Sequence, residues 1–146
     1  MRYRFVDKII SLEPGEKIEA QRTWPKDLEL FKDHFPGFPV VPGVLLTEMM
    51  GQAGALCLAA QESEQRSAIL LQIKDARFKG WALPDELLTI HAEVVSLQAK
   101  LARIKASTLK QGKRIATCEL LMAFEENQAL GLQNMDPVLE DFLAKQ

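Results

Sequence analysis

The chain has 146 residues, of which 47% are hydrophobic and 26% are charged, and this is the composition of an ordinary globular domain with one core. The net charge of -2 at pH 7 excludes the strongly basic surface that is typical of a nucleic-acid-binding protein. The two cysteines, Cys57 and Cys118, lie in separate apolar segments and match no metal-binding or redox spacing, so we expect buried free thiols in a reducing compartment.

The first third of the chain predicts a β-hairpin and a short helical turn. Residues 3–11 and 16–24 are expected strands, because "EPG" at 13–15 is a turn signal and the second segment alternates in polarity. The segment "PKDLELFKD" predicts one helical turn. The next residues, 33–43, are rich in proline and glycine, so we expect a rigid, irregular loop there.

Residues 44–60, "VLLTEMMGQAGALCLAA", predict a long helix that is buried on nearly every side. Gly51 and Gly54 make this helix slim enough for a sheet to approach closely, at a cost of roughly 1 kcal/mol each relative to alanine. The segment is shorter than the ~20 residues of a membrane span and carries Glu48 and Gln52. Because the N-terminus also lacks the apolar core of a signal peptide, we predict a cytoplasmic protein.

The rest of the chain is rich in predicted strands. Residues 68–80, 86–98, 99–110 and 113–125 are expected strands with short connections, which favour antiparallel pairing. Residues 136–146 predict a short helix, with Asp136 as its N-cap and Pro137 in its first turn.

These elements predict one α+β domain over residues 1–146, with a core from about 4 to 125 and a C-terminal extension. Its sheet would be curved, antiparallel and wrapped around the long helix. Long free edges of such a sheet are usually paired, so we expect a homodimer that joins two sheets.

Glu48 is unusual because it lies among apolar helical residues. A glutamate is rarely buried unless it is paired, and burial favours the protonated carboxyl, which can donate a proton as a general acid. Gln52 lies four residues further on, so it shares a helical face with Glu48 and can form a hydrogen bond with it. The alternative is that Glu48 lies on an exposed stripe of the helix.

His34 is the second candidate. A histidine in ordinary surroundings titrates at a pH of about 6.5 and can accept or donate a proton. Although a histidine in a loop often only fills space or caps a turn, the rigid loop that follows His34 would hold the ring in a fixed position. Gly43 and Val44 then begin the helix, and its first backbone N–H groups can polarise a carbonyl. A base, an acid and such an N–H are the groups needed to eliminate water from a 3-hydroxyacyl thioester.

The segment around these residues resembles the signature of the 3-hydroxyacyl-acyl carrier protein dehydratases of the FabZ type. The signature residues are "HFPG" at 34–37, "P" at 39, "PGVL" at 42–45, Glu48 and Gln52. A motif of this length is specific. The segments "VDKIISLEPGEKI" and "KDARFKG" resemble the same family, so the similarity extends from residue 4 to about residue 125.

This resemblance implies the hotdog fold, with no cofactor or metal. It implies His34 as the base acting at C2, Glu48 as the acid acting at C3 and the Gly43 N–H as the anchor of the carbonyl. It also implies a site shared by two subunits of a homodimer, which in the family often assembles into a trimer of dimers. The residues expected to contact substrate beside Gly43 are Phe35, Pro42, Val44 and Gln52.

The substrate would be a thioester of acyl carrier protein or of coenzyme A. Acyl carrier proteins are acidic, so Lys74, Arg77 and Lys79 are candidate docking residues, although a solvated sheet face explains them equally well. His91 matches no motif and is expected to be structural.

Three other functions stay open from the sequence. The first is a hotdog acyl-thioesterase, which would release free thiol. The second is a non-catalytic acyl-binding subunit. The third is a dehydratase of a specialised pathway that makes polyketides or aryl polyenes.

Overall fold

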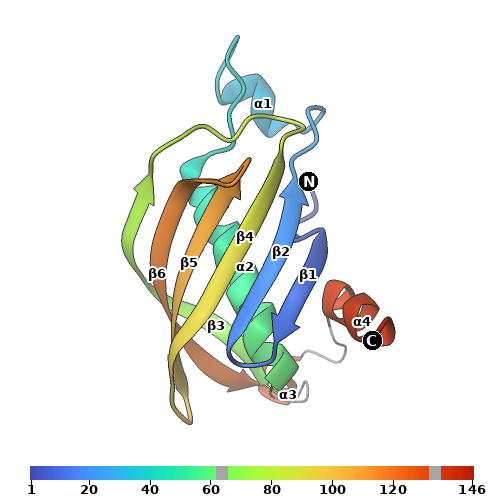
Figure 1. Cartoon of the computed structure of the whole chain (residues 1–146), viewed down its shortest axis with the longest axis vertical. Coiled ribbons are helices and arrows are strands. Elements are labelled where there is room, and N and C mark those ends of the chain that lie inside the picture. Colours follow the sequence, from blue (N-terminus) through green and yellow to red (C-terminus); the bar gives the residue numbers. More distant parts are fainter. Residues whose placement is uncertain (62–65, 132–135) are drawn as a thin grey trace.

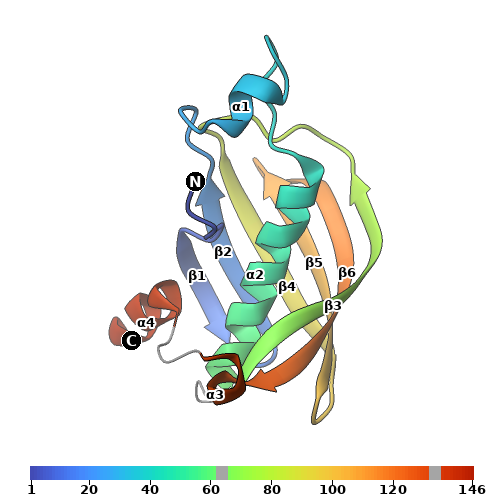
Figure 2. The same cartoon turned by 180° about the vertical axis from the view of Figure 1, so that it is seen from behind.

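The computed structural model describes residues 1–61, 66–131 and 136–146. Its centre is helix α2 (Gly43–Gln61), which lies along one face of a curved six-stranded sheet (Figures 1 and 2). By length and composition alone α2 could cross a membrane, but 56% of it is buried inside the protein, as befits a core helix. The predicted α+β architecture, a sheet wrapped around one helix, is confirmed.

The sheet has the strand order β1-β2-β4-β5-β6-β3, and every neighbouring pair is antiparallel. The strands are β1 (Lys8–Glu13), β2 (Lys17–Thr23), β3 (Arg66–Phe78), β4 (Leu87–Leu97), β5 (Leu101–Lys110) and β6 (Lys113–Glu126). The remaining helices are α1 (Leu30–Asp33), α3 (Asn127–Leu130) and α4 (Pro137–Ala144). The sheet therefore leaves two edges, β1 and β3.

Most predicted elements agree with the structure to within about three residues, but the first strand does not. It was expected at 3–11 and begins only at Lys8. The residues before it cross α2 instead, where the N–H of Phe5 donates a hydrogen bond to a side chain of that helix. Helix α3 was not predicted. Residues 62–65, between α2 and β3, lie outside the described residues.

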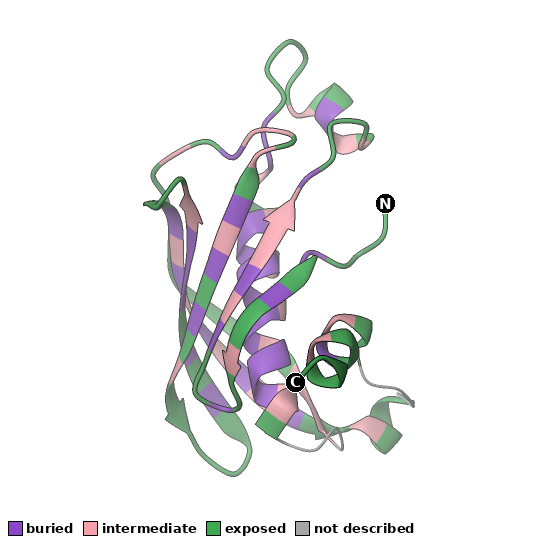
Figure 3. Ribbon diagram, turned by 45° about the vertical axis from the view of Figure 1, so that its right-hand side comes forward, coloured by how far each residue is buried: buried purple, intermediate pink, exposed green. Residues whose placement is uncertain are grey.

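Strands β4, β5 and β6 alternate between buried and exposed residues, which separates an inner face against α2 from an outer face in solvent (Figure 3). Small side chains are frequent on the inner face, for example Ala92, Ala102 and Ala106. They leave room for α2, whose own glycines allow a close approach. A Cβ built on Gly54 would lie 2.7 Å from Cδ1 of Ile104 on β5.

The outer face carries a row of alternating charge across five strands. The register places Lys17, Glu93, Lys105, Glu119 and Lys74 side by side on β2, β4, β5, β6 and β3. Lys105 Nζ lies 3.6 Å from Glu119 Oε1. Opposite charges on directly paired residues support this register.

Helix α4 lies beside β1 in both views (Figures 1 and 2). The carboxylate of Asp136 accepts a hydrogen bond from the N–H of Val138 at 2.9 Å, as expected for an N-cap. Leu139 is fully buried. The C-terminal segment is therefore packed onto the edge of the sheet that β1 forms.

The two glycines of α2 predict different responses to the same substitution, with Gly54→Ala the less stable variant. In Gly51→Ala the new methyl group would meet Leu120 and Met122 at 3.7 and 3.8 Å, which is ordinary contact, so we expect the free energy of unfolding to rise by about 1 kcal/mol. Gly54→Ala has the same gain in helix propensity but displaces Ile104. Urea unfolding of both variants tests this, and a Gly54→Ala protein at least as stable as Gly51→Ala contradicts it.

The two cysteines are free and buried, as predicted. Burial raises the pKa of the Cys57 thiol to about 11 and that of Cys118 to about 12. Since the thiolate is the reactive form, we expect neither cysteine of the folded protein to react with iodoacetamide at about pH 8, and both to react in denaturant. Mass spectrometry after alkylation measures this, and rapid labelling of the folded protein contradicts it.

Candidate active site

One stripe of α2 is left uncovered by the sheet and carries the candidate acid. Val44 is 75% exposed, and Glu48, Gln52, Ala55 and Ala59 follow at intervals of three or four residues, all half-buried. The prediction that Glu48 is buried is therefore wrong for the single chain. An apolar helix predicts burial on average, but the sheet contacts the opposite side.

Glu48 is bonded to Gln52, as predicted. The Nε2 of Gln52 donates a hydrogen bond to Oε1 of Glu48 at 3.1 Å. The same amide contacts the N-terminal segment: its Oε1 accepts the N–H of Phe5 at 2.7 Å, and its Nε2 donates to the carbonyl of Tyr3 at 3.4 Å. No sequence pattern indicates these two partners, because main-chain groups form hydrogen bonds regardless of side-chain type.

His34 is held in a fixed position by the loop that follows it. It caps the C-terminal end of α1, where its N–H donates to the carbonyl of Leu30. Its Nδ1 lies 2.9 Å from the carbonyl oxygen of Val40, and its ring stacks on Phe35 with centroids 4.0 Å apart. A carbonyl can only accept, so Nδ1 carries a proton, and in the neutral form of the ring Nε2 then holds the free lone pair.

The N-terminus of α2 presents unpaired N–H groups. The N–H groups of Leu45 and Leu46 donate to the carbonyl of Pro42. Those of Gly43 and Val44 have no partner among the residues that the structure describes. They also lie at the positive end of the helix dipole, so this end of α2 can polarise a carbonyl oxygen.

Aromatic side chains surround this end of α2. A Cβ on Gly43 would lie 3.1 Å from the ring of Phe78, so the missing side chain makes room for that ring. Phe38 and Trp81 meet edge to face with centroids 5.7 Å apart. Phe78 and Trp81 were not among the predicted site residues, although Phe78 lies in the family-like segment "KDARFKG" and Trp81 directly follows it. Together these rings give the helix end an apolar, solvent-exposed border.

His34 and Glu48 do not contact each other within one chain. Each has its own partners, the Val40 carbonyl for His34 and the Gln52 amide for Glu48, and no hydrogen bond joins the two side chains among the described residues. The single chain therefore presents the predicted groups as two separate parts.

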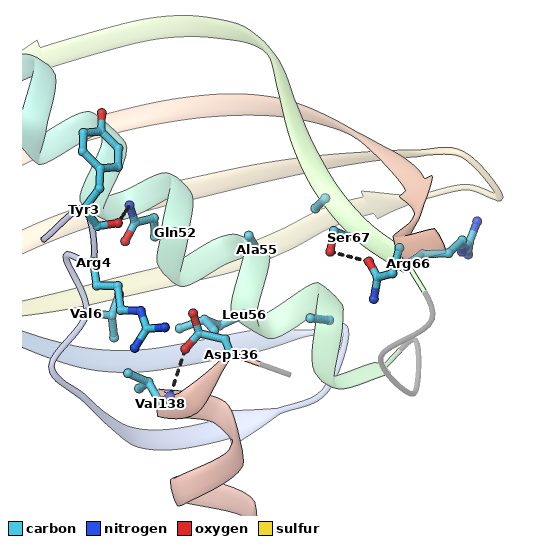
Figure 4. A pocket seen from close by; sticks show the side chains of 13 residues that line it. Tyr3, Arg4, Val6, Gln52, Ala55, Leu56, Arg66, Ser67, Asp136 and Val138 are labelled. Carbon is cyan, nitrogen blue, oxygen red and sulfur yellow. Dashed lines mark hydrogen bonds between the residues drawn. The ribbon is translucent and has the colours of Figure 1, made fainter. Parts of the chain in front are cut away.

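A cavity of about 240 Å³ extends along the uncovered stripe of α2 (Figure 4). Its floor is made of small apolar residues of the helix, and Gln52 stands beside Tyr3 at one side of it. The lining residues are Tyr3, Arg4, Val6, Gln52, Ala55, Leu56, Ala59, Arg66, Ser67, Ala68, Asn127, Asp136 and Val138. Glu48 and His34 are not among them.

The three candidate docking residues are exposed on the outer face of the sheet. Strict alternation would place Lys74 on the face opposite Arg77 and Lys79. The register of β3 against β6 shifts between Lys74 and Arg77, and this irregularity brings both side chains to the outer face. Acidic residues accompany them, including Asp75 beside Arg77 and Glu119 opposite Lys74. His91, also on this face, lies 3.4 Å from Glu19.

A single helix wrapped in an antiparallel sheet, with an imidazole, a carboxyl and a free helix N-terminus near one end, defines a hotdog protein that is equipped for acyl thioesters. A family model described as "FabA-like domain" matches residues 1–119. The chain belongs to this family.

Curated relatives agree with this assignment. The 3-hydroxyacyl-[acyl-carrier-protein] dehydratase FabZ of Caldicellulosiruptor saccharolyticus is 35% identical over 127 residues, which cover 85% of this chain and 91% of that protein. The FabZ of Ruminiclostridium cellulolyticum is 33% identical over 125 residues, which cover 84% of this chain and 88% of that protein. The resemblance to FabZ-type dehydratases is therefore confirmed.

Solved structures share the fold at lower identity. The dehydratase heterocomplex ApeI:P of Xenorhabdus doucetiae has a TM-score of 0.68 at 16% identity, covering 88% of this chain and 87% of that one. A hypothetical thioesterase of Streptococcus pneumoniae, solved with coenzyme A, has a TM-score of 0.66 at 13% identity, covering 82% of this chain and 85% of that one. These likenesses confirm the predicted hotdog fold.

Proposed function

We propose that this protein removes water from 3-hydroxyacyl thioesters, carried by acyl carrier protein, to give trans-2-enoyl thioesters in fatty acid or related biosynthesis. The observation that carries the proposal is the arrangement around α2. This helix presents a carboxyl in its second turn and free N–H groups at its start, and the loop before it fixes an imidazole with a free Nε2. Family membership supports the same reaction.

The thioester carbonyl would bind the N–H groups at the start of α2. A hydrogen bond from the Gly43 N–H to the carbonyl oxygen draws electron density away from the carbonyl and makes the C2–H more acidic. Nε2 of His34 takes the C2 proton, since Nδ1 is already bonded to the Val40 carbonyl. The electron pair released from C2–H forms the double bond between C2 and C3.

Glu48 would complete the elimination at C3. As the C3–O bond breaks, its carboxyl gives a proton to the departing hydroxyl, which leaves as water. In the reverse direction the carboxylate takes that proton back, so the reaction is reversible. Phe35, Pro42, Val44 and Gln52 border these groups and are proposed to contact the substrate.

The active form is proposed to be a homodimer formed through β3. This edge strand exposes large apolar side chains, with Leu71 57% and Ile73 49% accessible, as well as Ile69 and Leu70. An exposed apolar edge strand favours pairing with a second copy. Pairing would also bring a second chain toward the half-buried Glu48, and His34 of one chain is proposed to act with Glu48 of the other.

Two further assignments follow from the proposed reaction. Lys74, Arg77 and Lys79 are proposed to attract the acidic carrier protein, with the nearby carboxylates limiting their net charge. A cytoplasmic location, where acyl carrier protein thioesters are made and free thiols stay reduced, is proposed for the enzyme.

The first expected outcome is dehydration that depends on both candidate groups. We expect the protein to convert a 3-hydroxyacyl thioester into a conjugated enoyl thioester, measured by absorbance, without releasing free thiol. His34→Ala and Glu48→Gln should each reduce turnover by about 100-fold or more while circular dichroism shows an unchanged fold. Release of thiol in place of enoyl product would identify a thioesterase, and near-full activity of either variant would remove that residue from the mechanism.

The second expected outcome concerns the shared site. A dimer made only of His34→Ala chains, or only of Glu48→Gln chains, has no intact site. A mixed dimer contains one site in which both residues are intact. If equal amounts are unfolded and refolded together, half of the dimers are mixed, so activity should recover to about a quarter of the wild-type value. Each variant refolded by itself is the control. Sites built within one chain would give no recovery.

A further inference from the structure

We propose that the N-terminal main chain, at Tyr3 and Phe5, is a positioning element for the Glu48 acid and acts through the Gln52 amide. This inference rests on the proposed function. The sequence motif includes Gln52 and Glu48, but the two main-chain groups that fix the amide lie 47 and 49 residues away in sequence.

The orientation of the Gln52 amide is set by groups that have only one possible role. The N–H of Phe5 can only donate, and it lies 2.7 Å from one end of the amide, so this end must be the oxygen. The carbonyl of Tyr3 can only accept, which places the NH₂ group at the other end. In a flipped amide, the NH₂ group of Gln52 would face the N–H of Phe5, and two donors cannot form a hydrogen bond with each other.

The fixed amide in turn assigns the two oxygens of Glu48. The NH₂ group of Gln52 points to Oε1 of Glu48 at 3.1 Å and can only donate to it. Oε1 is therefore the accepting oxygen, and the proton that the acid delivers resides on Oε2. Without the Phe5 N–H, the Gln52 amide could turn and present its oxygen to Glu48. That oxygen would accept the carboxyl proton, and the proton would then not be available to the substrate hydroxyl.

The N-terminal segment is held firmly enough to impose this orientation. The ring of Phe5 is fully buried and packs between Tyr3 and Trp24, with centroid distances of 4.6 and 4.7 Å. Two residues further on, the carboxylate of Asp7 accepts a hydrogen bond from Arg22 at 2.6 Å and one from the N–H of Thr23 at 2.8 Å. The segment is thus anchored at the Phe5 ring and at Asp7, independently of Gln52.

The test replaces one atom of the main chain. An ester in place of the amide at Phe5, made by incorporating phenyllactic acid at position 5, removes the N–H donor and keeps the side chain. The matched control is the same replacement at Val6, whose N–H has no hydrogen-bond partner in the described part of the chain. A third variant, Gln52→Leu, removes the amide without changing the main chain.

We expect the ester at Phe5 to lower kcat by about 10-fold to 100-fold, with KM nearly unchanged. The alkaline limb of the kcat profile should move to higher pH, because the ionised carboxyl loses a donor. Gln52→Leu should show the same two changes, and the control ester neither. In the Gln52→Leu background the ester at Phe5 should change kcat by less than about twofold, because both act on one interaction.

Three results would overturn the inference. One is a kcat for the Phe5 ester within about twofold of that of the Val6 ester, and another is a pair of effects that simply multiply in the double variant. If the Phe5 ester does not fold, as judged by circular dichroism, Gln52→Leu decides alone, and an unchanged pH profile for it overturns the inference. Absence of dehydration by the unmodified protein would instead overturn the proposed function, and the inference with it.

Discussion

The close contact between α2 and the inner face of the sheet is the constraint on which the rest of the structure depends. At Gly54 the helix comes so near to Ile104 that a methyl group would not fit without movement. The helix is therefore fixed in depth and rotation, which decides which of its residues face outward. Glu48 and Gln52 lie on the outward stripe, and the first turn of α2 lies at the end of the sheet where the His34 loop arrives (Figure 2).

The site combines three rigid parts, of which the N-terminal segment is distant in sequence from the other two. The loop after α1 fixes the imidazole through a carbonyl that can only accept, and the N-terminal segment fixes the Gln52 amide through groups of defined polarity. The start of α2 supplies N–H groups whose direction is set by the helix itself. In each case the orientation of a reactive group is determined by the main chain, which has fewer alternative conformations than side chains do.

The sequence predicted the elements whose residues follow a regular pattern, and it missed features that depend on contacts between distant segments. The helix expected at 44–60 is found at Gly43–Gln61, because its apolar run is continuous. The first strand was placed too early, because Phe5 bonds to a side chain of α2 instead of a neighbouring strand. The exposure of Glu48 depends on which side of the helix the sheet covers, and Phe78 reaches Gly43 across sequence-distant elements.

The position of α4 has a consequence for how copies of this protein can assemble. A sheet with two open edges can add a neighbour at each side and grow into a fibre. Here α4 packs beside β1, and β1 itself is short and irregular in register, so only the β3 side remains open. Edge-to-edge pairing through the proposed β3 interface would therefore stop at a twofold-symmetric pair and would not continue into a fibre.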